Sequence, residues 1–403
     1  MSLGRLDKHL ACSGAIQRVA RSENTIACQY NNNNNTHSMA ETQPDANGQT
    51  VDGASEYFRN TQRPKQLSKH EALAKEFIQY HVETNPDRRI AIVTSGGTTV
   101  PLEKQTVRFI DNFSAGTRGA TSAEYFLQAD YAVIFLHRQF SLLPYSRHYS
   151  HSTNCFLDFM DEADDGGVIV ADEFQAKMRR VLQQYQHAKK NRLLLLLPFT
   201  TVTEYLYALR SLATLTKPLG PRTLFYLAAA VSDFFIPADR LEEHKIQSRE
   251  TADGKGSGKK LIIDLDPVPK FLKTLVQQWA PKGSMVVSFK LETDPELLVS
   301  KAEESLSRYQ HDCVIGNLLT TRKWEVVFIT RDRGEKWIRV PKARRSKSFS
   351  GVENMVGLAD HKKEPEQIDL EGGTVTEGME IETLIIPELK RMHDDVIARQ
   401  ERH

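Results

Sequence analysis

The sequence contains several short apolar runs that do not alternate with polar residues, and segments with helical periodicity separate them. The clearest of these runs read RIAIVTS, YAVIFLHR, RLLLLLPF, TLFYLAAAVSDF, SMVVSFKLET and CVIGN. Strands that are apolar on both sides are typical of parallel sheets covered by helices on both faces. The pattern therefore predicts an α/β chain with a doubly wound, mostly parallel, Rossmann-like sheet. The runs WEVVFITRD and KWIRV predict a late β-hairpin, which a final helix follows.

Capping and spacing signals mark the segments between the strands. Ser68 and Glu71 have the spacing of a capping box, in which each residue satisfies a free backbone amide of the other. Leu206, Leu209 and Leu212 recur at a spacing that places them on one helix face. Pro295 suits the first turn of a helix, where its missing N–H costs nothing. These signals predict helices beginning near residues 68, 203 and 295.

The chain divides by composition into a polar tail and a long folded part. Its 403 residues suit one large domain or two ordinary ones. Residues 1–66 are polar, contain the tract Asn31–Asn35, and carry too few large apolar side chains to offset chain entropy. We therefore expect a disordered, Asn-rich tail over 1–66 and a folded domain over 67–403. Polar segments at about 158–192 and 343–367 look like insertions into that domain.

Charge and cysteine usage exclude several classes of protein. The net charge of +1 gives no reason to expect nucleic acid or an anionic membrane as a partner. No apolar stretch reaches the roughly 18–20 residues that a membrane helix needs. Cys12, Cys28, Cys155 and Cys313 lie far apart, without metal-finger spacing, so we expect free thiols in a reducing compartment such as the cytoplasm.

Small and polar residues occur in five segments that we expect to lie at strand ends. They are TSGGTT (94–99), DNFSAGTRG (111–119), AAAVSDF (228–234), SFKLETD (288–294) and GNLL (316–319). Open parallel sheets bind ligands beyond the carboxyl ends of their strands. Any one of these segments could be an ordinary turn, but five in one chain favour a ligand site.

The second of these segments has the features of a phosphate-binding turn. Ser114, Gly116 and Gly119 stand between a strand-like run and an Ala-rich helix. Glycine allows an anion to approach the backbone, and the helix N-terminus offers unpaired N–H groups. The spacing fits neither the P-loop nor the dinucleotide fingerprint. Lys245 and Lys290, near other strand ends, could neutralise phosphate charge, and either could also be an ordinary surface lysine.

Other chemistry-bearing residues are less specific. Asp233 and Glu292 could bind a cation, orient an amine or cap a helix. Tyr185 and Lys189 have the spacing used by short-chain dehydrogenases, but no TGxxxGxG turn accompanies them, so we treat that spacing as coincidence. The sequence contains neither a GxSxG elbow nor an HExxH pair.

Several long motifs together resemble one family. They are TSGGTTVPLEKQTVRFIDNFSAGTRGATSAE, FYLAAAVSDFFIP, EHKIQS, APKGSMVVSFKLETDP and YQHDCVIGN. They resemble phosphopantothenoylcysteine synthetase, also called phosphopantothenate–cysteine ligase, of the eukaryotic type, over roughly residues 68–340 and the final helix. The resemblance implies a ligase of coenzyme A synthesis that joins 4′-phosphopantothenate to L-cysteine through an acyl-nucleotide. It further implies ATP or CTP as co-substrate, Mg²⁺, and a homodimer with shared active sites.

The resemblance also implies roles for individual residues. The residues implied to contact phosphopantothenate are Arg108, Asn112, Ala229, Ala230 and Asp233. Arg108 would reach the phosphate, either within its own subunit or across the dimer interface. Those that resemble the family's nucleotide-binding set are Gly96, Ser114, Gly116, Gly119, Phe289 and Asn317. Asn112, Lys245 and Lys290 would stabilise the charged transition state, and the residue that binds the metal stays unidentified.

This sequence departs from the bacterial members of the family at one motif. Bacterial relatives have KIKK where this chain has KIQS, at Lys245–Ser248, so the bacterial lysine roles and CTP preference do not carry over directly. ATP is the expected nucleotide. Two other classes stay open: a nucleotide-dependent dehydrogenase, and a non-catalytic regulatory paralogue of the ligase family.

Overall fold

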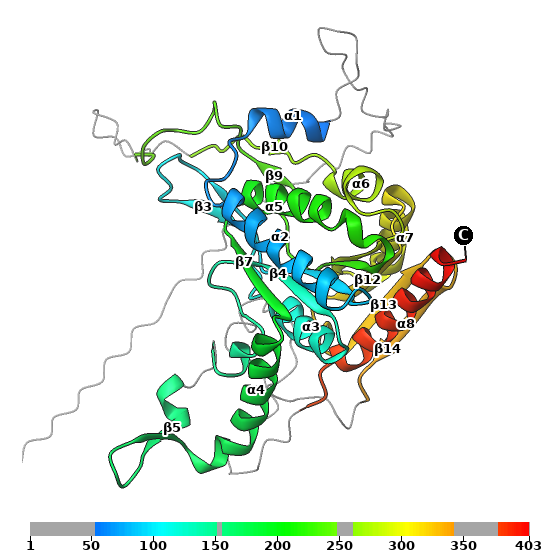
Figure 1. Ribbon diagram of the computed structural model, residues 1–403. Helices are drawn as coiled ribbons and strands as arrows, with labels where there is room; N and C mark the ends of the chain where they lie inside the picture. Colours follow the sequence, from blue (N-terminus) through cyan, green and yellow to red (C-terminus); the bar gives the residue numbers. More distant parts are fainter. Residues whose placement is uncertain (1–52, 151–154, 248–260, 342–377, 403) are drawn as a thin grey trace, which may run out of the picture. The chain divides into compact units, whose positions relative to one another are not determined.

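The computed structural model describes residues 53–150, 155–247, 261–341 and 378–402 (Figure 1). All of these residues belong to one compact unit, 51–403. The Asn-rich tract and the 343–367 insertion lie outside the described residues, so the expectations for them remain predictions.

An eight-stranded sheet forms the centre of the fold, in the order β14-β13-β12-β11-β8-β1-β4-β7. The strands are β1 (Ile90–Ser95), β4 (Ala132–Arg138), β7 (Leu194–Phe199), β8 (Thr223–Leu227), β11 (Met285–Glu292), β12 (Cys313–Leu318), β13 (Glu325–Thr330) and β14 (Gly334–Arg339). The first six are parallel, and β13 and β14 form an antiparallel hairpin at one edge. The predicted α/β class, the parallel sheet and the late hairpin are confirmed.

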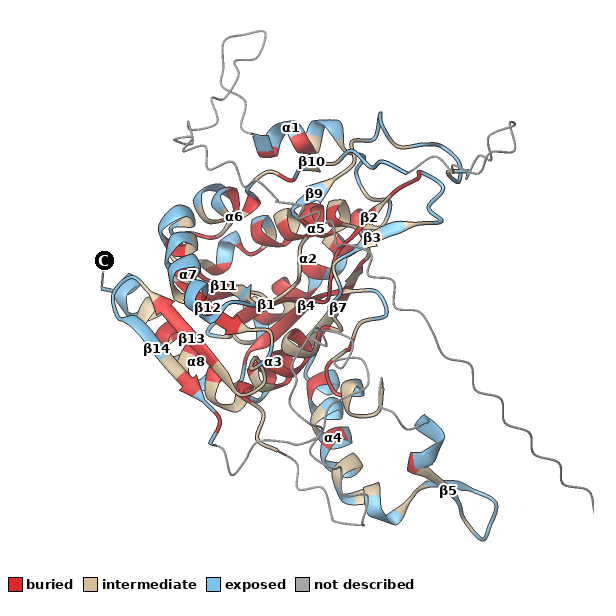
Figure 2. Ribbon diagram, turned by 180° about the vertical axis from the view of Figure 1, so that it is seen from behind, coloured by how far each residue is buried: buried red, intermediate tan, exposed pale blue. Residues whose placement is uncertain are grey.

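Helices cover both faces of the sheet because successive strand residues point to opposite sides. In β1, Ile90 and Ile92 join the core beneath α2 and α5, whereas Ala91 and Val93 join the core beneath α3 and α8 (Figure 2). The main helices are α2 (Leu67–Thr84), α3 (Thr117–Gln128), α5 (Val202–Leu215), α7 (Pro295–Tyr309) and α8 (Glu382–Gln400). Shorter ones are η1 (Ser146–His148), η3 (Lys217–Arg222), α6 (Phe271–Thr274) and the π-helical turn η4 (Leu275–Trp279).

The order of the strands creates a switch point beside β1. From β1 the chain moves outward through β4 to β7, and it then returns to the other side of β1 as β8. In doubly wound sheets, ligands bind beyond the carboxyl ends of the strands at such a switch point. We call this region, beyond the ends of β1 and β8, the crevice. Two small ladders lie beyond the main sheet: β2 (Thr99–Pro101) with β3 (Phe109–Asp111), and β9 (Phe234–Phe235) with β10 (Asp266–Pro267).

The ordered part begins earlier than residue 67. Helix α1 (Gly53–Asn60) lies inside the segment predicted to be a disordered tail, and that boundary was wrong for residues 53–66. Tyr57 is 3% exposed, its hydroxyl lies 2.9 Å from Thr203 Oγ1, and its ring meets Phe271 edge-on. Aromatic burial against distant residues holds α1, which composition alone does not indicate.

The predicted capping box at Ser68 is absent. Helix α2 begins at Leu67, and its N-cap residue Gln66 makes no side-chain cap. Glu71 instead accepts a hydrogen bond from Ser211 Oγ at 2.7 Å and pairs with Arg63 at 2.6 Å. Contacts between helices therefore replace the local cap.

The insertion at 158–192 folds as a small hairpin followed by a polar helix. Its elements are η2 (Phe156–Phe159), β5 (Met160–Glu162), β6 (Val168–Val170) and α4 (Asp172–Lys190). Helix α4 buries only Val181 and Ala188, as its polar sequence leads one to expect.

The final helix, α8, is anchored through a buried histidine. His393 Nδ1 lies 2.9 Å from the hydroxyl of Tyr131, and Nε2 lies 2.7 Å from the carbonyl oxygen of Pro221. Burial lowers the pKa of His393 to about 4, so the ring is neutral at pH 7. A neutral ring that donates from Nε2 and accepts at Nδ1 satisfies both partners.

Candidate functional site

Four of the five predicted strand-end segments lie side by side. They lie at or just beyond the carboxyl ends of β1, β8, β11 and β12, which are consecutive strands of the sheet. The fifth, which contains the glycine turn, follows β3 of the small hairpin and not a strand of the main sheet. Parallel strands end at the same edge, so the sequence signal gathers at the carboxyl edge beside the switch point.

The ends of β1 and β8 are joined by their backbones. The amide of Ala230 donates to the carbonyl oxygen of Gly96 at 2.8 Å, and the amide of Thr98 donates to that of Ala230 at 3.0 Å. The amide of Ala229 donates to Thr94 Oγ1 at 3.1 Å. These bonds fix the backbone of the two predicted alanines at the floor of the crevice.

Asn112 is bonded to these linked ends of β1 and β8, which we call the β1–β8 crossing. Its amide donates to the carbonyl oxygen of Thr98 at 3.2 Å, and its side chain is half-buried. The backbone of Asn112 passes so close to Gly97 that a Cβ on Gly97 would stand 1.6 Å from the Asn112 carbonyl oxygen. Asn112 therefore lies next to Gly97 and Thr98, and Thr98 is bonded in turn to Ala230.

The glycine turn rests on the end of β1. Ser95 Oγ donates to the carbonyl oxygen of Gly116 at 3.0 Å, and Gly116 has φ +83°, a conformation that favours glycine. Gly119 lies within α3, where a Cβ would approach Ser95 Cβ to 2.4 Å. Close packing of helix on strand thus explains Gly119, for which the sequence pattern alone indicates the approach of an anion.

Ser141 is a residue that sequence reasoning missed. It follows β4, and a Cβ on Gly116 would stand 3.3 Å from its hydroxyl oxygen. That hydroxyl is buried and has no hydrogen-bond partner among the described residues. No motif marks this serine, because its proximity to the turn arises only when β4 lies next to β1.

Arg108 belongs to a segment that we call the arm, the β2–β3 hairpin at residues 99–111, and Lys245 lies in a segment beside it. Glu103 in the arm is fully buried, and hydrogen bonds from the amides of Arg108 and Val107 lower the pKa of its carboxyl group. Arg108 Nη1 lies 3.3 Å from Glu103 Oε1 and donates to the carbonyl oxygen of Ile246 at 2.9 Å. Lys245, next to Ile246, is exposed.

The neighbouring strands β11 and β12 carry the other predicted residues. Lys290 pairs with Glu292 at 3.1 Å, and the ring of Phe289 meets Tyr226 edge-on at 5.0 Å. Asn317 is 7% exposed and stands in register with Leu291. Lys290 and Lys245 therefore belong to different elements, one in the sheet and one beside the arm.

Asp233 follows the end of β8 and is exposed. Its carbonyl oxygen accepts a hydrogen bond from the amide of Val268 at 2.8 Å, which connects the end of β8 to the β9–β10 ladder. The carboxylate therefore remains available to a substrate amine or to a cation, as the sequence left open.

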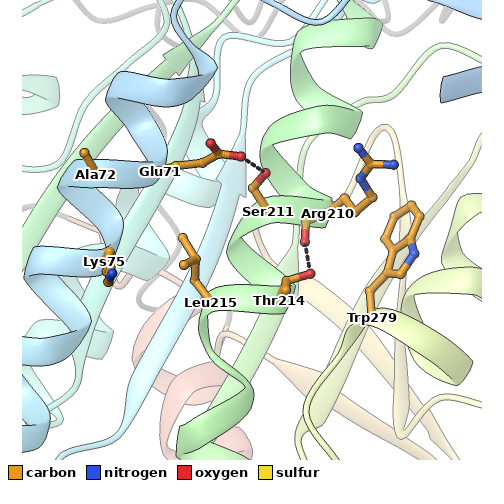
Figure 3. A pocket seen from close by; sticks show the side chains of 8 residues that line it. All are labelled: Glu71, Ala72, Lys75, Arg210, Ser211, Thr214, Leu215 and Trp279. Atoms are coloured by element: carbon orange, nitrogen blue, oxygen red, sulfur yellow. Dashed lines mark hydrogen bonds between the residues drawn. The ribbon is translucent and has the colours of Figure 1, made fainter. Parts of the chain in front are cut away.

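A cavity of about 390 Å³ lies elsewhere, between α2, α5 and η4 (Figure 3). Its lining includes Lys75, Arg210 and Trp279, and it contains none of the predicted site residues. Arg210 packs over the ring of Phe58, 3.8 Å from its centroid. The proposed site is the strand-end crevice rather than this groove on the outer face.

The described residues contain no group of three or more His, Cys, Asp and Glu side chains arranged to hold a metal ion. No helix in the described ranges has the length and apolar character needed to cross a membrane.

Comparisons with known proteins show which family the chain belongs to. A family model described as the DNA/pantothenate metabolism flavoprotein C-terminal domain matches residues 208–350. Phosphopantothenate–cysteine ligase CAB2 of Saccharomyces cerevisiae is 48% identical over 312 residues, which cover 72% of this chain and 81% of that protein. The Homo sapiens phosphopantothenate–cysteine ligase is 44% identical over 252 residues, covering 62% of this chain and 78% of its own length.

A solved structure gives the same result. A Cab2 mutant in complex with phosphopantothenate-cysteine superposes with a TM-score of 0.70 and 44% identity, covering 86% of this chain and 99% of that one. The strand order and these relatives define a doubly wound α/β enzyme. The chain belongs to the family of phosphopantothenate–cysteine ligases, which form a C–N bond. This membership favours the catalytic alternative over both the dehydrogenase and the non-catalytic paralogue.

Proposed function

We propose that this chain joins 4′-phosphopantothenate to L-cysteine in two steps that share one crevice, with ATP as the nucleotide. A carboxylate oxygen of phosphopantothenate attacks the α-phosphorus, and pyrophosphate leaves. The cysteine amine then attacks the acyl carbon, loses a proton, and displaces the nucleoside monophosphate. Neither step needs a protein nucleophile, so the chain must supply positioning and charge stabilisation.

The observation that carries the proposal is the position of Asn112 between two parts of the site, the β1–β8 crossing and the glycine turn. Its backbone is bonded to Thr98 at the β1–β8 crossing, and two residues later the chain enters the turn that Ser95 holds. Phosphopantothenate would lie along Asn112, Ala229 and Ala230, with Asp233 beside the incoming amine. A nucleotide at the N-terminus of α3 would then bring its α-phosphate next to the carboxylate.

The remaining predicted residues complete the nucleotide half of the crevice. Ser114, the turn amides near Gly116 and the free hydroxyl of Ser141 are donors for phosphate oxygens. Phe289 and Asn317, at the ends of β11 and β12, would border the nucleoside, and Lys290 would balance the charge that develops. Mg²⁺ fits as a companion of the nucleotide, because this ion is commonly held by substrate phosphates and few protein oxygens.

One assay tests the proposal directly. Purified full-length protein should release pyrophosphate from ATP only when both phosphopantothenate and cysteine are present, and CTP should support a lower rate. Release without phosphopantothenate would contradict the two-step route. Binding of both substrates without any release of pyrophosphate would favour the non-catalytic paralogue instead.

We also propose that two copies associate through the arm, so that Arg108 reaches the phosphate bound in the partner's crevice. The arm exposes apolar side chains at Val107 and Phe109, 57% and 50% exposed, and Phe113, two residues beyond it, is similarly exposed. Clusters of this kind mark interaction surfaces. The occupant suggested by the family resemblance is a second copy.

Phe109→Asp is therefore expected to turn a dimer into a monomer and to lower activity, most strongly at low protein concentration, because a charge in an apolar interface is strongly disfavoured. Light scattering after size exclusion measures the mass of each variant. Leu157→Asp, in the exposed insertion, is the matched control and should leave the mass unchanged. A monomeric wild type, or a Phe109→Asp dimer of unchanged affinity, would contradict an interface at the arm.

A further inference from the structure

Arg118 connects the glycine turn to two distant parts of the chain. It is the second residue of α3, two positions after Gly116. Its Nη1 donates to Glu382 Oε1 at 2.6 Å, and its Nη2 donates to the carbonyl oxygen of Arg322. The side chains of Arg118 and Glu382 are 18% and 8% exposed, so the pair is largely shielded from water.

Arg322 belongs to the turn between β12 and β13, which is attached to the other wall of the nucleotide crevice. The amide of Leu319 in this turn donates to the carbonyl oxygen of Glu292 at the end of β11, at 3.0 Å. Arg322 Nη1 in turn donates to the carbonyl oxygen of Leu319. The turn begins directly after β12, the strand that carries Asn317. Glu292, to which the turn is bonded, lies two residues beyond Lys290. Arg118 thus joins the phosphate end of the crevice to the nucleoside end.

Glu382 is the first residue of α8, which lies outside the segment matched by the family model, residues 208–350. A second polar contact connects α8's entry to α3: the Tyr125 hydroxyl donates to Glu380 at 3.0 Å. Tyr125 lies two helical turns further along α3 than Arg118. Its contact therefore holds the two helices together without touching the glycine turn.

The hydrogen bonds of Arg118 argue against its being a phosphate ligand. A guanidinium in the first turn of a phosphate-binding helix would ordinarily be available to the anion. Here one terminal nitrogen is committed to a buried carboxylate and the other to a backbone carbonyl. A planar guanidinium that bonds to two separate acceptors is instead suited to fixing the separation of the elements that it joins.

We propose that Arg118 and Glu382 form a clamp that sets the width of the nucleotide crevice, and that the C-terminal helix is therefore part of the nucleotide site. This inference rests on the proposed function in one respect, namely that the nucleotide occupies the turn at Gly116. Arg118 is a positioning residue and acts through the backbone of α3 and the turn at Arg322.

The clamp predicts an effect on the nucleotide alone. Arg118→Met should raise the KM for ATP about tenfold or more, while the KM values for phosphopantothenate and cysteine change less than twofold, because small misplacements of positioned groups are costly. Arg118→Lys, which replaces two separated terminal nitrogens with a single one, should recover only part of the affinity. Tyr125→Phe is the control for helix docking and should leave the KM for ATP unchanged.

The direction in which Glu382→Gln changes the KM for ATP shows whether Arg118 positions the turn or binds phosphate itself. If Arg118 only positions the turn, Glu382→Gln weakens the clamp and raises the KM for ATP. If Arg118 were a ligand restrained by Glu382, the same change would release it and lower the KM. A lowered or unchanged KM for ATP in Glu382→Gln, or equal changes for all three substrates in Arg118→Met, would overturn the inference.

Direct titration with ATP keeps the clamp testable apart from the reaction. If wild-type protein releases no pyrophosphate, the proposed function fails, and the dissociation constant for ATP still reports on the clamp. Wild type and Tyr125→Phe should then bind ATP equally, with Arg118→Met and Glu382→Gln weaker. Thermal unfolding of all four proteins with and without ATP should show the smallest ligand-induced rise in Tm for the two clamp variants. Equal rises in all four would count against the clamp.

Discussion

Asn112→Ala is expected to lower kcat by about 10²–10³-fold, the usual cost of removing one donor that stabilises developing charge. The loss should be specific, because the backbone amide of Asn112, and not its side chain, makes the bond to Thr98. The variant should therefore fold normally, with a Tm close to that of wild type. Pyrophosphate release at saturating substrates measures kcat, and thermal unfolding measures the Tm.

Two companions sharpen this experiment. Asn112→Asp keeps the shape of the side chain but replaces the amide donor with a carboxylate, which would repel the substrate carboxylate, so its kcat should fall at least as far. Asn191→Ala removes an amide at the end of α4, away from the crevice, and should retain wild-type kcat. Wild-type turnover in Asn112→Ala would remove the assignment of this residue.

Much of the fold could be predicted because burial is recorded in local sequence patterns. Strand β1 is buried at every position, and its run of apolar residues shows this directly. Pro295 begins α7 as expected, with Asp294 as its N-cap accepting a hydrogen bond from the amide of Glu296. Four polar strand ends could likewise be predicted to lie at one edge of the sheet, because the carboxyl ends of parallel strands meet at the same edge.

The parts that could not be predicted depend on contacts between distant residues. The arginine–glutamate pair at 118 and 382 joins positions 264 residues apart, and neither residue stands in a pattern that signals a partner. The hydroxyl of Ser141 is aimed at the glycine turn only because β4 pairs with β1. Helix α1 was missed for the same reason, since its stability comes from aromatic rings supplied by later segments.

Gly97 gives a stronger test of the geometry than any other glycine in the turn regions. Gly97→Ala is expected to reduce kcat/KM by about 10²-fold or more, because the added Cβ would meet the carbonyl oxygen of Asn112 at 1.6 Å, and that atom belongs to backbone. The clash can be relieved only if the chain at Asn112 moves away from the β1–β8 crossing. The free energy of unfolding should fall by about 1–3 kcal/mol, as for other overpacked buried sites.

A matched control separates this local displacement from a general effect of replacing glycine. Gly53→Ala, at the first residue of α1, adds the same methyl group where the nearest heavy atom is Pro269 Cβ at 3.8 Å, so activity and stability should match wild type. Steady-state kinetics with each substrate varied and chemical denaturation of both variants provide the comparison. Because the displaced backbone is that of Asn112, the Gly97→Ala variant should lose little further activity when Asn112 is also changed to alanine. Fully multiplicative losses in the double variant would mean that the two residues act independently, contrary to the contact that joins them.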